Sequence, residues 1–134
     1  MRRIATFTLA FTAAAALTLT AQQTKGPVET YMAYLDACAK ATSLDAVLPY
    51  FTAEMEAGWK KAPKAQQDNF FKFKIKGENL SDVKVVTQKT EGKKTRLTLT
   101  AKTAAGRQAT GDVTMVQEGT AWKVDEDAWN MPTP

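Results

Sequence analysis

The sequence contains no histidine and only one cysteine, Cys38, among its 134 residues. Without an imidazole, Ser–His and Cys–His nucleophile systems are excluded, and the commonest metal ligand is absent. A single cysteine also excludes an intramolecular disulfide. Cys38 shares one face of an expected helix with apolar side chains, so the sequence predicts a buried structural thiol and no reactive one.

The chain has a small excess of positive charge. The chain has 18 basic and 14 acidic residues, and its first 21 residues hold Arg2 and Arg3 but no carboxylate. The remaining 113 residues therefore carry 16 basic and 14 acidic side chains, a net charge of +2. This excess is too small to predict a nucleic-acid partner, and no aromatic-basic recognition motif is present.

The N-terminal segment has the order of a cleavable secretory signal peptide. Arg2 and Arg3 precede an uncharged run, residues 4–21, which ends in the small residue Ala21 before polar Gln22. A transmembrane anchor is the alternative, but the many Ala and Thr residues make the run only modestly apolar. We expect cleavage after Ala21, export to the periplasm or the extracellular space, and no membrane attachment afterwards.

The rest of the chain suits one domain. Its length provides a core that needs no disulfides. We expect a signal peptide at 1–21, a short linker at 22–26, a single α+β domain at 27–131 and a tail at 132–134.

The first half of this domain has helical patterns. A helix over 27–41 would begin at Pro27 and bury an apolar stripe that includes Cys38. Thr42 is expected to cap a short helix that Pro49 interrupts, and Thr52 to cap a third helical piece.

Residues 63–77 fit two structures. The alternation over 71–76 would suit a strand, whereas Pro63 and Gly77 are typical of a helix start and stop. No turn signal separates them, so we predict a helix.

Six lysines make residues 60–76 basic. A solvated helix face is the favoured interpretation, with an anion patch as the alternative: Lys60, Lys61, Lys64, Lys72, Lys74 and Lys76.

After Asn79 the apolar positions alternate with a period of two, and short Gly-containing turns separate four strands. This predicts an antiparallel meander with helices on one face only. The inward positions would be Leu97, Leu99, Ala101, Ala109, Gly111, Val113, Met115, Trp122 and Val124. The same alternation places Asp112, Lys123 and Asp125 outside, so we expect no ionisable side chain on the inner face. Residues 125–127 are expected to form a solvated acidic cluster.

The chain ends on a strand with the sequence Glu118-Gly119-Thr120-Ala121-Trp122-Lys123-Val124-Asp125, followed by Trp129. Together with the order of elements, this ending resembles exported bacterial members of the nuclear transport factor 2-like superfamily, the cystatin-like α+β cone. The resemblance spans residues 27–129 and implies a curved, cone-shaped sheet. The superfamily includes isomerases, dehydratases, polyketide cyclases and non-catalytic binding modules, so the fold does not determine the function.

Isomerase-like relatives place a tyrosine on an early helix and acidic groups inside the cone. Tyr31 and Tyr34 fit the first requirement, but the expected outward position of Asp112 leaves the second unmet. We therefore predict a non-catalytic exported domain that binds a small apolar ligand or a protein partner. The alternatives are a small cone-fold enzyme and a structural or interaction module of the cell envelope.

No catalytic residue, cofactor or metal site is predicted, and a homodimer is left open. Apolar side chains between helices and sheet are either core residues, which is the favoured interpretation, or the lining of a pocket: Tyr31, Phe51, Met55, Trp59, Met115 and Trp129.

Overall fold

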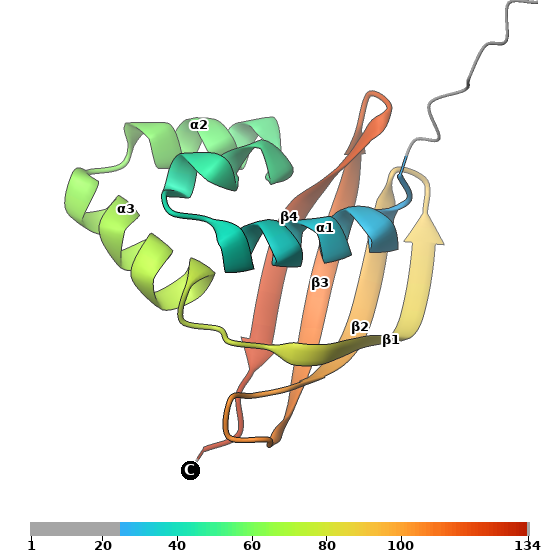
Figure 1. Cartoon of the computed structure of the whole chain (residues 1–134). Coiled ribbons are helices and arrows are strands. Elements are labelled where there is room, and N and C mark those ends of the chain that lie inside the picture. Colours follow the sequence, from blue (N-terminus) through green and yellow to red (C-terminus); the bar gives the residue numbers. More distant parts are fainter. Residues whose placement is uncertain (1–24, 134) are drawn as a thin grey trace, which may run out of the picture.

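The structure is a computed structural model, and it describes residues 25–133 (Figure 1). The expected signal peptide and most of the expected linker lie outside the described residues. The described chain is an α+β domain. Its helical elements are α1 (Pro27–Lys40), the 3₁₀ turns η1 (Leu44–Ala46) and η2 (Leu48–Tyr50), α2 (Ala53–Lys61), α3 (Lys64–Phe70) and the π-helical η3 (Phe71–Ile75).

Four strands follow the helices and form one antiparallel meander, as predicted. They are β1 (Ser81–Glu91), β2 (Lys94–Lys102), β3 (Gln108–Glu118) and β4 (Ala121–Asn130), and they are hydrogen-bonded in the order β1-β2-β3-β4. Helix α1 crosses one face of this sheet, while α2 and α3 lie toward the β4 side (Figure 1). We call the face that α1 covers the inner face.

Local sequence determines where the helices begin. Pro27 opens α1, and the Glu29 carboxylate accepts a hydrogen bond from the Gly26 backbone N–H at 2.6 Å. The Thr52 hydroxyl accepts a bond from the Met55 N–H at 3.4 Å, which confirms the predicted cap of α2.

Two helix predictions need correction or extension. The residue before η1 is Ser43 and not Thr42, no side chain caps that turn, and the expected short helix is a pair of 3₁₀ turns. The predicted helix over 63–77 is confirmed, because α3 runs on into η3. The alternation over 71–76 is therefore not that of a strand.

The core lies between α1, the 3₁₀ turns and the inner face. Its fully buried members include Tyr31, Tyr34, Val47, Phe51, Leu97, Leu99, Val113, Met115 and Val124. The backbone N–H of Thr52 also donates to the carbonyl of Val124 at 3.2 Å. The helical half is thus joined by a backbone bond to the free edge of β4.

The pattern of β4 differs from the predicted one. Val124 pairs with Met115 and Glu126 pairs with Thr114, so Asp125 is the extra residue of a β-bulge. Asp125 and Glu126 are both exposed, and the residues after them change face. Asp127 then pairs with Val113 on the inner face. The expectation of an inner face without ionisable side chains is therefore wrong, as is that of a solvated cluster at 125–127.

Other strand predictions hold. Asp112 is exposed between buried Gly111 and Val113, on the outer face as predicted. Trp122 pairs with Gln117 on the inner face but is only half-buried, because it lies near the end of the sheet. Among residues 25–133, no helix is long and apolar enough to span a membrane.

Candidate functional site

Asp127 is a buried carboxylate on the inner face of β4. Its side chain is 6% exposed, and the bulge at Asp125 is what turns it inward. A carboxylate in such a position requires hydrogen bonds or an opposite charge, because burial penalises its ionised form. Asp127 has both.

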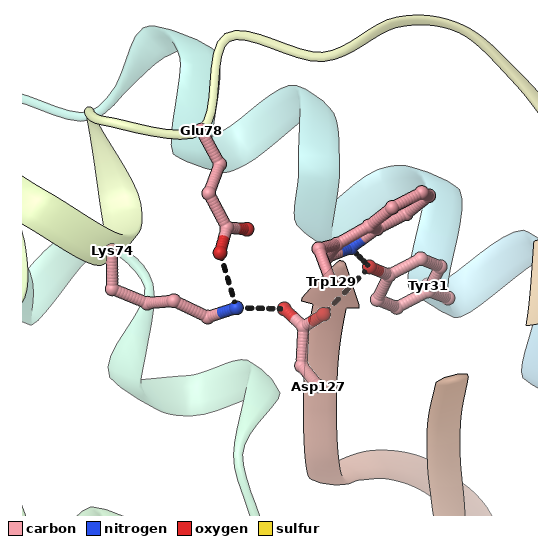
Figure 2. Close-up of polar contacts among 5 residues, drawn as sticks. All are labelled: Tyr31, Lys74, Glu78, Asp127 and Trp129. Atoms are coloured by element: carbon pink, nitrogen blue, oxygen red, sulfur yellow. Dashed lines mark hydrogen bonds and ion pairs between the residues drawn. The ribbon is translucent and has the colours of Figure 1, made fainter. Parts of the chain in front are cut away.

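The first support comes from α1 and from β4 itself (Figure 2). The Tyr31 hydroxyl donates to Oδ1 of Asp127 at 3.0 Å, and Nε1 of Trp129 donates to the Tyr31 oxygen at 2.9 Å. Trp129 can lie this close to the sheet because its partner on β3 is Gly111. A Cβ atom added there would lie 2.8 Å from the indole ring.

The second support is Lys74, in the π-helical turn η3. Its Nζ atom lies 2.7 Å from Oε1 of Glu78 and 3.7 Å from Oδ2 of Asp127 (Figure 2). The side chains of Lys74 and Glu78 are each 22% exposed, so this ion pair is partly shielded from water. π-helical turns occur frequently at functional sites, because the wider turn redirects side chains.

These charged groups border a cavity of about 130 Å³ between α1, η3, the segment 77–80 and β4. Part of the lining is apolar and is contributed by Leu35, Cys38, Ala39, Ile75 and Leu80. Polar groups complete it: Tyr34, Lys74, Lys76, Glu78, Asn79 and Asp127. We call this space the α1–β4 cavity.

Burial sets the protonation of several groups in and around this cavity. It raises the pKa of the Cys38 thiol to about 11, so that this thiol is neutral at physiological pH and a poor nucleophile. Burial and the nearby Asp127 charge raise the pKa values of Tyr31 and Tyr34 far above their ordinary value. Desolvation also raises the pKa of Glu78, against the opposing effect of Lys74. The buried position of Cys38 is as predicted.

The six residues considered as pocket lining lie elsewhere. Tyr31, Phe51 and Met115 are buried in the core, and Met55, Trp59 and Trp129 pack against it half-buried. None of the six borders the α1–β4 cavity. Tyr31 and Trp129 nevertheless belong to the network that holds Asp127.

The sequence did not identify Asp127 or Glu78 as site residues, and it included Lys74 only among the six lysines of an alternative anion patch. One signal could have found Asp127. Val124 and Trp129 are both apolar but are separated by an odd number of positions, so both can face inward only if the strand holds an extra residue between them. Lys74 and Glu78 carry no comparable signal, because their role depends on a strand far along the chain.

The described part of the chain, residues 25–133, holds no group of three Cys, Asp or Glu residues that could bind a metal ion. Comparisons with protein-family models, with curated proteins and with solved structures find no match for the chain.

Proposed function

We propose that this domain is a binding module that holds a small neutral ligand in the α1–β4 cavity. The observation that carries the proposal is a space of about 130 Å³ whose lining combines apolar surface with equal numbers of positive and negative side chains. A cavity of comparable size holds benzene in another protein, so a ligand of roughly six non-hydrogen atoms would fit.

The charge balance favours a neutral ligand. Lys74 and Lys76 supply two positive charges, and Glu78 and Asp127 supply two negative ones. Nζ of Lys76 is fixed by the carbonyl oxygens of Cys38 and Ala39, at 3.2 and 2.8 Å. A charged ligand would lose its hydration on entering the cavity. It would find no excess of opposite charge there to offset that loss. A short apolar body with a hydrogen-bonding head matches the lining better.

The same contacts argue against catalysis. Tyr31 and Lys74 engage Asp127, and Lys74 also engages Glu78, so neither carboxylate is a free base. The raised pKa of Cys38 removes the one candidate nucleophile of the cysteine type.

We also propose that the domain is exported after cleavage near Ala21 and that its fold is of the nuclear transport factor 2-like type. The Arg2-Arg3 and Ala-rich segment supports export, and the order of helices followed by a four-stranded meander supports the fold. N-terminal sequencing of exported protein should then begin at or near Gln22, and protein that still begins at Met1 in the membrane fraction would contradict cleavage.

The binding proposal can be tested with three small probes of similar shape and different charge. In ¹H–¹⁵N NMR spectra, propionamide should shift the resonances of residues around Leu35, Lys74 and Asp127, whereas propionate and propylammonium should not. Leu35→Phe should abolish the shifts by filling the cavity. Met32→Phe is the matched control, because it adds an aromatic ring on an exposed position of the same helix. Stronger binding of a charged probe, or no binding of propionamide, would overturn the proposal.

An enzyme that transfers protons is the second candidate. It is favoured by Glu78, because an acid with a raised pKa beside a cavity is typical of general acid–base sites. Native mass spectrometry of protein from its own source would identify a retained ligand. If incubation with the protein alters that ligand and Glu78→Gln stops the change, then catalysis is the correct account.

A further inference from the structure

Positive charge is concentrated in two segments, residues 60–76 and the β1–β2 hairpin. Residues 81–102 contain six Lys or Arg and two acidic side chains, a net charge of +4. Residues 25–133 as a whole carry +2, since only Arg2 and Arg3 of the 18 basic residues lie outside them and all 14 acidic residues lie within. The other described residues therefore carry a net charge of −2. Residues 60–76 hold six lysines against Asp68, but Lys60, Lys64 and Lys74 are engaged in ion pairs, whereas the hairpin charges lie along two paired strands.

The strand register places most of these charges on one face. Lys84 pairs with Thr100, Lys89 pairs with Arg96, and Lys94 pairs with Glu91, all on the outer face that α1 does not cover. Lys102 extends the row at the far end of β2. We call this set the basic stripe: Lys84, Lys89, Lys94, Arg96 and Lys102. The bulge that displaces β4 lies at the opposite side of the sheet and does not affect this register.

The stripe is exposed and only partly neutralised. The side chains of Lys84, Lys89 and Lys102 are 70%, 77% and 60% exposed. Asp82 is shared between Lys84 and Lys102 at 3.7 and 4.0 Å, and Glu91 lies 3.2 Å from Lys89. Within the hairpin two carboxylates thus face five cations, and Asp112 of β3 lies opposite Thr98 on the same face.

Lys89 and Arg96 lie directly opposite each other on neighbouring strands. Like charges at such positions destabilise a sheet, and alternation of sign would avoid the cost at no structural penalty. An anionic group that bridged the two cations would replace this repulsion with two attractive contacts. Lys89, Glu91, Lys94 and Arg96 also border a shallow depression of about 220 Å³.

The chemistry of the stripe indicates the class of partner. β1 and β2 contain no aromatic side chain on which nucleic-acid bases could stack. Of the exposed large apolar side chains in the described residues, only Val86 belongs to the hairpin, and one such side chain is too little apolar surface to enter a lipid headgroup layer. Between the cations lie the hydroxyl groups of Thr87, Thr98 and Thr100.

We propose that the basic stripe binds a linear acidic polysaccharide. The cations would pair with carboxylate or sulfate groups of the polymer, and the threonine hydroxyls would bond its sugar hydroxyls. Nine residues of β2 span about 30 Å at roughly 3.3 Å per residue, which is long enough for several sugar units. Such binding depends on the release of counterions and therefore weakens steeply with salt. The site is separate from the α1–β4 cavity and does not depend on the proposed function.

Heparin is a suitable probe, and dextran is its uncharged counterpart. Isothermal titration of the full domain should show heparin binding that weakens as salt rises, and no dextran binding. The triple variant Lys89→Gln/Lys94→Gln/Arg96→Gln should lose about tenfold or more in affinity and show a smaller salt slope. Its control is Lys60→Gln/Lys61→Gln/Lys64→Gln, which removes the same charge from α2 and α3 and should change affinity by less than about threefold.

The control variant and two further probes make the result decisive. An equal loss in both triple variants would mean that net charge alone attracts heparin, which overturns the proposal. Tighter binding to phosphatidylglycerol vesicles or to single-stranded oligothymidylate than to heparin would overturn it in favour of a membrane or a nucleic acid. A circular dichroism spectrum and a urea midpoint equal to those of the unchanged domain would show that the stripe variant is folded, so that its loss of heparin binding is specific.

Discussion

Asp127 joins three parts of the chain that are distant in sequence. It accepts the Tyr31 hydrogen bond from α1, it lies near Lys74 of η3, and it is itself held by the β3–β4 pairing. Its energetic role can be measured with two substitutions. Asp127→Asn keeps an acceptor for Tyr31 but removes the charge beside Lys74, and we expect a loss of about 1–3 kcal/mol in unfolding free energy. Asp127→Ala also leaves the buried Tyr31 hydroxyl without its acceptor, and we expect about 3–5 kcal/mol.

The neighbouring Asp125 provides the control for this prediction. It is the exposed bulge residue of the same strand, so Asp125→Asn should change the unfolding free energy by less than about 0.5 kcal/mol. Urea denaturation monitored by tryptophan fluorescence measures all three variants. If Asp127→Ala were as mild as Asp125→Asn, Asp127 could not be the buried centre of the network.

Residues whose environment depends on one helical turn could be predicted from the sequence. The Thr52 cap and the buried Cys38 are of this kind, because their partners lie within three or four positions. Asp127 could not be predicted by strict alternation, since a single extra residue in β4 reverses every side chain after it. Its partners Tyr31 and Lys74 lie far away in sequence, and only the folded topology brings them together.

At the scale of elements, the contact between β3 and β4 depends on the absence of a side chain at Gly111. The Trp129 ring occupies the space that a Cβ atom would need, and the same ring donates the hydrogen bond to Tyr31. Gly111→Ala should displace the ring, and we expect it to cost about 1–3 kcal/mol by overpacking. Near-ultraviolet circular dichroism should change as well, because the tryptophan environment changes.

A second glycine gives the opposite expectation. Gly58 lies within α2, and nothing lies within 4 Å of a Cβ atom added there. Gly58→Ala should stabilise the protein by about 0.5–1 kcal/mol through its higher helix propensity. Equal effects of the same sign at Gly111 and Gly58 would contradict the close Trp129 packing.

The elements themselves were largely predictable, and their irregularities were not. Helix α1 and the meander follow from apolar periodicity and Gly-containing turns. The π-helical turn that directs Lys74 toward Asp127 has no signature in Phe71–Ile75, whose alternation suggests a strand instead. The six aromatic and methionine positions, for which core was favoured and pocket lining was the alternative, lie at helical and strand spacings, which identify a buried face but do not distinguish core from cavity.

At the scale of the whole molecule, the concentration of buried acids on α1 determines how stability depends on pH. Tyr31, Tyr34 and Cys38 lie on one face of that helix, and burial raises the pKa of each. The unfolded chain would release these protons near their ordinary pKa values, 9.0 for the thiol and 10.0 for the phenols. Below pH 9 both states keep the protons, so these groups cause no change in stability there.

Above pH 9 the unfolded state binds fewer protons than the folded state, so the unfolding free energy must fall as pH rises. For Cys38 the fall extends to about pH 11, where the folded thiol also ionises. Each group contributes a slope of up to about 1.4 kcal/mol per pH unit, so the three together should lower the unfolding free energy by about 5 kcal/mol at pH 11. Urea titrations between pH 7 and 11 measure this slope. Tyr34→Phe should make it shallower above pH 10 by about the contribution of one group, and Cys38→Ala should do so from pH 9. If both variants kept the full slope, these side chains would not be the groups that burial holds in their protonated form.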